Sequence, residues 1–259
     1  MIRFSANLGF LWTELSLPDG IRAAAKAGFD AVECHFPYDH DVAAVRAALE
    51  ETGLPMLAIN TVRGDVDAGE FGLCALPGRQ AEARASIEQA VAYAEKIGAR
   101  AVHCMAGRTQ RAGARIAYLE NLTYAADLAE GAGLSVLIEP INHRDAPHYH
   151  LSRLDEAEDV IRSLERPSIE LMMDLYHSQI TEGDLTKSLE LYQPILGHVQ
   201  IAAVPSRQEP EGGEVNFPVV LKALDGMGYE GFVGAEYRPA GQTEDGLGWL
   251  ARFRAALKG

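Results

Sequence analysis

Residues 131–140 read GAGLSVLIEP, and this stretch carries the pattern that decides the fold. Gly133 follows a helical segment, where a glycine suits the left-handed position just past a helix C-terminus. The apolar run that comes next lacks polar alternation, which is typical of a parallel strand buried on both faces. A carboxylate, Glu139, ends the run. The stretch therefore predicts a helix, a tight turn and a buried parallel strand with an acidic end.

The same order of elements recurs through the chain. It appears in KAGFDAVE, ETGLPMLAIN, KIGARAVHC and GMGYEGFVGAE, at 26–33, 51–60, 96–104 and 226–236. Eight strands are predicted, at about 2–6, 30–34, 56–60, 100–104, 134–139, 169–174, 197–201 and 232–236. Eight helices are predicted, near 18–27, 41–52, 79–97, 113–131, 153–164, 185–193, 217–226 and 246–257. Eight near-equal βα units favour closure into a single (β/α)8 TIM barrel, with a doubly wound open sheet as the structural alternative.

Composition bounds the domain organisation and the partners. The 259 residues are 47% hydrophobic and 23% charged, as in an ordinary globular protein, and carry a net charge of −14. No linker or compositional break divides them, so we expect one TIM-barrel domain over residues 1–259. The negative charge opposes binding to nucleic acid and to anionic membranes. A small molecule is therefore the expected binding partner, and the sequence leaves open whether the chain forms a homo-oligomer.

Cysteine usage and the apolar runs bear on the compartment. The three cysteines form no CxxC pair, which is typical of reduced thiols. The N-terminus lacks the long apolar run of a signal peptide, and no apolar run is long enough to span a bilayer. We therefore expect a cytoplasmic protein.

Polar residues stand at the ends of four of the apolar runs: Glu139, Asp174, Gln200 and Glu236. Because the carboxyl ends of barrel strands converge on one face, we expect these four side chains to meet there. Three carboxylates and an amide at one point need a cation, since like charges so close cannot all stay ionised. Oxygen ligands suit Mg²⁺ or Mn²⁺ better than Zn²⁺. Any one of the four, taken alone, is equally well read as a helix cap.

Four further residues are candidates for the walls of this site. His177 follows Asp174 in a D-x-x-H pattern, on the expected loop after the sixth strand, and is a candidate hydrogen-bond partner for a substrate oxygen. His143, after the fifth strand, has a similar interpretation. Arg207, in a Gly/Pro-rich loop, is a candidate ligand for a substrate carboxylate, and a solvated loop arginine is the alternative for it. Trp12 is a candidate pocket wall, and ordinary packing is the alternative for it.

Motifs for other chemistries are missing from the sequence. It contains no G-x-x-x-x-G-K-[ST], no G-x-G-x-x-G and no G-x-S-x-G, so we expect no nucleotide cofactor and no serine-hydrolase nucleophile. No predicted strand ends in a lysine, which disfavours Schiff-base chemistry there.

Several short motifs carry a resemblance to a known family. They are IEPINH (138–143), DLYH (174–177), GHVQIA (197–202), EPEGGEVNF (209–217) and AEYRP (235–239). With them the chain resembles the hydroxypyruvate isomerases of the xylose isomerase-like barrel superfamily. The likeness extends from RFSANL (3–8) to TEDGLGW (243–249), and so covers nearly the whole chain.

The resemblance implies a mechanism. It implies a (β/α)8 barrel whose divalent metal is held by Glu139, Asp174, Gln200 and Glu236, with the two glutamates as the acid/base pair. The implied reaction interconverts hydroxypyruvate and 2-hydroxy-3-oxopropanoate (tartronate semialdehyde) through a cis-enediolate. A 2-oxo-tetronate isomerase and a ketose 3-epimerase are alternatives with the same metal site. A metal nuclease of the AP-endonuclease type is disfavoured by the acidic charge, and a non-catalytic small-acid or sugar-binding barrel is the alternative outside enzymes.

One departure from the family pattern bears on the substrate. The family commonly reads Q-I-A-D-N-P after the seventh strand, whereas this chain has Ala203 and Val204 in place of the Asp-Asn pair. We expect this change to remove two polar groups near the pocket mouth and to leave the metal site intact.

Overall fold

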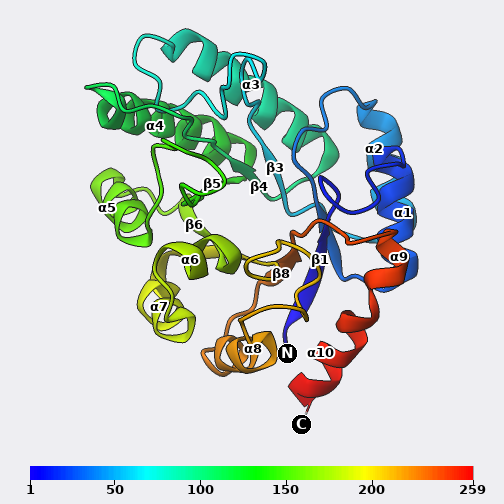
Figure 1. The fold of residues 1–259 in the computed structure, drawn as a ribbon. Coiled ribbons are helices and arrows are strands. Elements are labelled where there is room, and N and C mark those ends of the chain that lie inside the picture. Colours follow the sequence, from blue (N-terminus) through cyan, green and yellow to red (C-terminus); the bar gives the residue numbers. More distant parts are fainter. Residues whose placement is uncertain (259) are drawn as a thin grey trace.

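The computed structural model describes residues 1–258, which form one eight-stranded sheet surrounded by helices (Figure 1). The strands are β1 (Arg3–Asn7), β2 (Ala31–Glu33), β3 (Ala58–Asn60), β4 (Ala101–His103), β5 (Ser135–Ile138), β6 (Ile169–Asp174), β7 (Leu196–Ile201) and β8 (Phe232–Ala235). They are ordered β2-β1-β8-β7-β6-β5-β4-β3, and all neighbours pair in parallel. Val32 of β2 forms an isolated parallel bridge with Met56, which lies two residues before β3. The sheet is thus a nearly closed barrel, which confirms the predicted fold class.

Helices connect successive strands. They are α1 (Leu17–Ala27), α2 (Val42–Thr52), α3 (Gln80–Ile97), α4 (Ala114–Ala132), α5 (Leu154–Leu164), α6 (Leu175–Thr181), α7 (Leu185–Tyr192), the 3₁₀ turn η1 (Gln193–Ile195), α8 (Phe217–Gly226), α9 (Thr243–Gly246) and α10 (Gly248–Lys258). The eight predicted helices are present within two residues of their expected starts. The sequence missed α6 and α9, and the loop that we expected after β6 is the helix α6.

Helix ends follow the glycine pattern of the sequence. Gly28 and Gly98 cap α1 and α3 with φ angles of 87° and 71°, a left-handed backbone that residues with a side chain rarely adopt. Their N–H groups donate to carbonyls of the last helical turn. These caps end each helix and turn the chain back toward the next strand.

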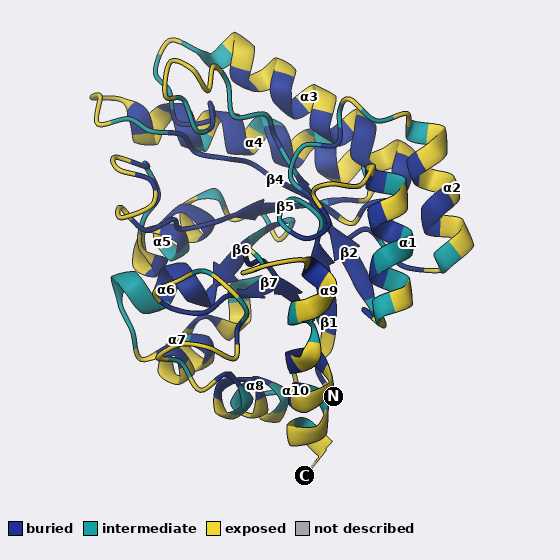
Figure 2. Cartoon of the chain, turned by 45° about the vertical axis from the view of Figure 1, so that its right-hand side comes forward, coloured by how far each residue is buried: buried dark blue, intermediate teal, exposed yellow. Residues whose placement is uncertain are grey.

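The apolar core of the described residues consists of one large cluster and two smaller ones. The large cluster lies between the sheet and the helices, whose outer faces are exposed while the strands are buried (Figure 2). A smaller cluster joins one residue from each of four consecutive strands, Ala58, Ala101, Leu137 and Met172. In β5 and β6, the residue two positions after the cluster member is Glu139 or Asp174, on the same face of the strand. The barrel interior is therefore apolar in this layer and becomes polar toward the strand ends.

Two further expectations concern the whole chain. Among residues 1–258, no helix is both long and apolar enough to cross a membrane. The predicted single domain over residues 1–259 includes Gly259, which lies outside the described residues.

Candidate active site

All eight strands carry a polar residue at their carboxyl end or one position from it. These residues are Asn7, Glu33, Asn60, His103, Glu139, Asp174, Gln200 and Glu236. Sequence analysis recognised the last four and missed the first four. The same signal, a polar residue at the end of an apolar run, was present in the first four strands, but three of those strands have only three residues.

The four predicted metal ligands are all at most 6% exposed. Asp174 and Gln200 are register partners on β6 and β7, and the N–H of Glu236 donates to Ile201 O at 3.2 Å. Asp174 uses one oxygen as the N-cap of α6, since Oδ1 accepts from the N–H of Tyr176 at 2.8 Å. Its other oxygen, Oδ2, does not take part in this cap.

Three of these ligands have buried oxygens without a hydrogen-bond partner within residues 1–258. They are Glu139 Oε1, Asp174 Oδ2 and Gln200 Oε1. A buried acceptor without a partner costs about 1–3 kcal/mol, and charged groups cost more. Three such oxygens at the ends of three adjacent strands fit a bound cation, which would satisfy all of them. The donor set therefore fits the divalent metal that the sequence predicts.

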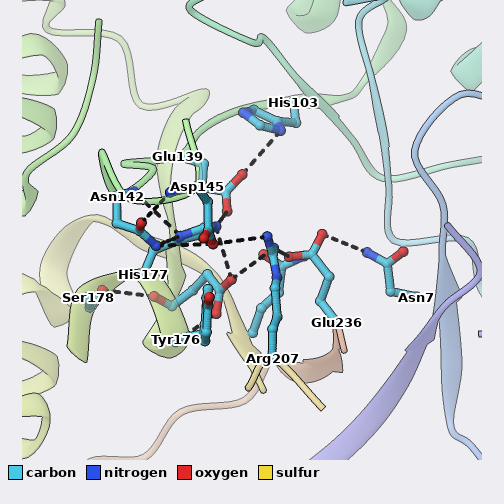
Figure 3. A network of polar contacts seen from close by, with 12 residues as sticks. Asn7, His103, Glu139, Asn142, Asp145, Tyr176, His177, Ser178, Arg207 and Glu236 are labelled. Carbon is cyan, nitrogen blue, oxygen red and sulfur yellow. Dashed lines mark hydrogen bonds and ion pairs between the residues drawn. The ribbon is translucent and has the colours of Figure 1, made fainter. Parts of the chain in front are cut away.

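Glu139, Asp174 and His177 form a group in which one ligand atom of each lies within 4.8 Å of the others. His177 Nε2 is 3.8 Å from Glu139 Oε1 (Figure 3) and 3.5 Å from Asp174 Oδ2. His177 is thus in the first turn of α6 and in the site, not on a loop as predicted.

The surroundings of His177 fix its tautomer. The backbone N–H of Asn142 and its side-chain Nδ2 both point at Nδ1, at 3.4 and 2.5 Å. Asn142 Oδ1 accepts from the N–H of Asp145, so the NH₂ end of this amide is the end that faces the ring. The ring proton therefore sits on Nε2, which cannot bind a metal while protonated. Burial lowers the pKa of His177 well below its usual value, and the charge of Arg207 lowers it further.

Arg207 lies among the carboxylates. Its Nη2 is 3.0 Å from Glu236 Oε2 (Figure 3) and 3.6 Å from Asp174 Oδ2. The guanidinium lies between the rings of Phe10 and Tyr176, 5.1 and 5.0 Å from their centroids. A positive charge is thus held at the centre of an acidic site, as an anionic substrate requires.

Comparisons with known proteins identify the family of the chain. The sequence model of the family described as "Xylose isomerase-like TIM barrel" matches residues 21–253. The chain belongs to this family. It is 45% identical to a 2-oxo-tetronate isomerase from Cupriavidus necator over 257 residues, which cover 98% of this chain and 99% of the relative.

Two further relatives extend over nearly the whole barrel. A putative hydroxypyruvate isomerase from Homo sapiens is 45% identical, covering 97% of this chain and 95% of its own. A crystal structure described as AP endonuclease, family 2, from Brucella melitensis superposes with a TM-score of 0.94 at 40% identity, covering 97% and 99% of the two chains. Within the xylose isomerase-like family, the chain is an enzyme of the isomerase type.

In this chain, a cavity of about 470 Å³ opens onto the candidate active site. Glu139, His177, Arg207, Glu236 and Trp12 contribute to its lining. The Trp12 side chain is held by a hydrogen bond from Nε1 to Glu244 Oε1 at 2.6 Å. A cavity of this size fits a small acid or a sugar.

His143 lies elsewhere. It is exposed, its Nε2 contacts Tyr149 O at 3.1 Å, and it is not among the residues that line the cavity. The structure therefore does not bring His143 together with the other predicted site residues.

The two residues that depart from the family motif also lie away from the cavity lining. Ala203 and Val204 are buried and do not contribute to its described lining, so the expectation that they lie at the pocket mouth is wrong. The O of Ala203 accepts from the N–H of Arg207 at 2.7 Å. These residues can act on the substrate only through the loop that positions Arg207.

Burial and neighbouring charges separate the pKa values of the carboxyl groups. Burial raises the pKa of Glu139 well above its usual range, and Glu236 and Asp174 raise it further. Burial and the charge of Glu236 raise the pKa of Asp174 to about 8. Burial acts in the same direction on Glu236, but the hydrogen bond from His35 and the charge of Arg207 outweigh it and lower the pKa to about 2. A cation at this site therefore competes with protons for Glu139 and Asp174.

The raised pKa of Asp174 predicts how stability depends on pH in metal-free protein. Its folded pKa is about 8, against about 3.9 in an unfolded chain. The folded state thus binds more protons over this window, so the free energy of unfolding falls as pH rises from about 4 to about 8. Protein stripped with EDTA should melt at a lower temperature at pH 9 than at pH 6.

Asp174→Asn is the matched control for this prediction. Asparagine keeps an oxygen for the N–H of Tyr176 but does not titrate. Between pH 6 and pH 9 the melting temperature of both proteins is measured without metal. The decrease in Asp174→Asn should be smaller than the decrease in the wild type by at least about 2 °C, which corresponds to about 1 kcal/mol in a chain of this size. An equal fall in the two proteins would contradict the assignment.

Proposed function

We propose that this chain is a metal-dependent isomerase that interconverts hydroxypyruvate and tartronate semialdehyde. The observation that carries the proposal is the set of buried, unpartnered oxygens of Glu139, Asp174 and Gln200 beside the N–H of His177 and the guanidinium of Arg207. The names of the relatives support it. We further propose that residues 1–259 act as one domain.

Four residues would hold the metal: Glu139, Asp174, Gln200 and Glu236. Their oxygens favour Mg²⁺ or Mn²⁺. When bound, such a cation supplies a Lewis acid that polarises the substrate carbonyl and stabilises negative charge that develops on its oxygen.

The two glutamates then carry the proton transfer. One carboxylate removes a proton from C3 of hydroxypyruvate, which gives the cis-enediolate, and the other group delivers a proton to C2. The hydroxyl proton on C3 passes to the oxygen on C2, so atoms balance and no redox or nucleotide cofactor is needed. Glu139 follows β5 and Glu236 follows β8, with β6 and β7 between them, so the two groups reach the cavity from different sides.

The remaining residues bind the substrate and exclude water. The Nε2–H of His177 donates to a substrate oxygen, and Arg207 binds the substrate carboxylate through charge-assisted hydrogen bonds. Trp12 closes one wall of the cavity. His143 is not proposed as a substrate contact, because it does not line the cavity.

Isomerisation of 2-oxo-tetronate is the second candidate. The Cupriavidus necator relative that bears this name is as similar as the human one, and the cavity accommodates a four-carbon acid as well. A ketose 3-epimerase would use the same metal site, but a neutral sugar gives Arg207 no carboxylate to bind. Cleavage of abasic DNA is not proposed, since a net charge of −14 opposes polyanion binding.

Deuterium incorporation separates these functions. The protein is incubated in ²H₂O with hydroxypyruvate, 2-oxo-tetronate or a ketose, and with Mn²⁺, Mg²⁺ or EDTA, and the substrates are analysed by NMR after removal of the metal. We expect exchange at C3 of hydroxypyruvate that requires Mn²⁺ or Mg²⁺. Faster exchange and conversion of 2-oxo-tetronate would transfer the assignment to the second candidate. Equal exchange in EDTA would refute metal dependence, and no reaction with any acid would refute the proposed function.

A further inference from the structure

A second buried polar cluster adjoins the proposed metal site. Its centre is Glu33, at the end of β2, which is 2% exposed. Four side chains direct polar hydrogens or ring nitrogens at its two oxygens: Ser5 Oγ at 3.1 Å, Asn7 Nδ2 at 3.1 Å, His198 Nε2 at 2.6 Å and Gln200 Nε2 at 2.8 Å. The proposed reaction gives Glu33 no role in binding or proton transfer, and Glu33 is not among the residues that line the cavity.

The contact with Gln200 decides which way its amide points. An amide has a donor end and an acceptor end, whereas a carboxylate only accepts. Glu33 Oε1 therefore takes the NH₂ end, and Gln200 Oε1 is turned to the opposite side. There it is buried and has no hydrogen-bond partner among the described residues. The reverse orientation would set two oxygens against each other and aim the NH₂ group at the cation.

Asn7 links Glu33 to a second proposed metal ligand, Glu236. Its Oδ1 accepts from the N–H of Gly9 at 2.9 Å, so its NH₂ end is the free end. That Nδ2 lies 3.1 Å from Glu236 Oε1 (Figure 3) and 3.1 Å from Glu33 Oε1. One amide group thus bridges Glu33 and the acidic end of β8.

We propose that Glu33 is a positioning residue for the metal: it orients the Gln200 amide directly and Glu236 through Asn7. The inference rests on the proposed metal site. Partners of metal ligands typically contribute 10–100-fold to metal affinity, because they hold the ligand atom in place before the metal arrives. A purely structural role, in which Glu33 only ties β1, β2 and β7 together, would affect stability without affecting metal affinity.

Calorimetric Mn²⁺ titration of the full-length protein separates the two roles. Glu33→Ala should bind Mn²⁺ about 10–100-fold more weakly than the wild type. Glu33→Gln should stay within about threefold, because the glutamine oxygen can still accept from Gln200 and Asn7. Its NH₂ group then donates to Ser5 Oγ and to His198 Nε2, which accepts once the neutral ring carries its proton on Nδ1. Asp30→Ala is the control. It removes a carboxylate that accepts from the N–H of Phe4 and pairs with Arg254, so it should lower the melting temperature and leave Mn²⁺ affinity unchanged.

The orientation of Gln200 can also be measured in the wild type. Protein with ¹⁵N in its glutamine side chains gives one NH₂ pair per glutamine, and the pair that is missing in Gln200→Glu assigns Gln200. This pair should be protected from hydrogen exchange without metal, and it should stay protected in saturating Mg²⁺. The measurement decides the question even if Glu33→Ala does not fold.

The outcomes are distinguishable. Wild-type affinity in Glu33→Ala, a loss in Glu33→Gln as large as in Glu33→Ala, or free exchange of the Gln200 amide would each overturn the inference. If the wild type bound neither Mn²⁺ nor Mg²⁺, the proposed function would fail, and the exchange measurement alone would still decide the orientation of Gln200.

Discussion

Glu139→Gln and Glu236→Gln are each expected to lower kcat by about 10²–10⁴-fold, the contribution of a positioned acid or base. Glutamine has the shape of glutamate and keeps one oxygen for the metal, but it cannot exchange protons with carbon. The barrel should remain folded, because the lost group lies at the end of a strand and not in the apolar core. Initial rates with hydroxypyruvate at saturating Mn²⁺, together with circular dichroism, measure both effects.

Glu170→Gln is the control for these two variants. Glu170 lies near the amino end of β6, away from the site, so the substitution should leave kcat within about twofold. Deuterium exchange then separates the roles of the two glutamates. The variant that lacks the acid should still exchange the C3 hydrogen of hydroxypyruvate, and the variant that lacks the base should not. Full turnover in either glutamine variant would refute the acid/base pair.

Arg207→Met is expected to lower kcat/KM for hydroxypyruvate by about 10²-fold or more. Each hydrogen bond to a charged group contributes about 1.5–3 kcal/mol, and the guanidinium can offer two of them to a carboxylate. Methionine keeps apolar contacts with Phe10 and Tyr176 but removes the charge. Steady-state rates over a range of substrate concentrations measure the loss.

Two comparisons make this prediction specific. Arg238→Met removes a guanidinium that also lies over Phe10, 5.4 Å from the ring centroid, but that contacts no carboxylate in the described part of the chain. Arg238→Met should lower kcat/KM for hydroxypyruvate by less than tenfold. The uncharged amide of hydroxypyruvate should be turned over equally poorly by the wild type and by Arg207→Met. An equal loss in Arg207→Met and Arg238→Met would instead place the substrate carboxylate at the rim of the cavity.

Much of the barrel could be predicted from local patterns. Gly133 and the apolar run to Ile138 locate one helix end and one buried strand, because both signals depend on neighbouring residues only. The helix α6 was missed for a local reason as well. It starts at Leu175, directly after β6, and Asp174 is at once the last residue of the strand and the cap of the helix, so no turn residue separates the two elements.

The candidate site was predicted less completely. Asp174, Gln200 and the two glutamates stand at the ends of clear apolar runs, and the structure brings them to one end of the barrel. Glu33 was missed because β2 has only three residues and because its partner His198 lies 165 positions away in the sequence. His143 shows the opposite error, since a position after a strand does not determine where a loop side chain points.

The sequence by itself determined the alternation of helices and buried strands, and hence the barrel and the acidic end of its strands. Only the tertiary structure decided which atom of each side chain is free. The contact of Asn142 sets the proton of His177, Glu33 turns the oxygen of Gln200 outward, and Arg207 lies between Asp174 and Glu236. Hydrogen bonds act over about 3 Å between strands far apart in the chain, so no local pattern records them.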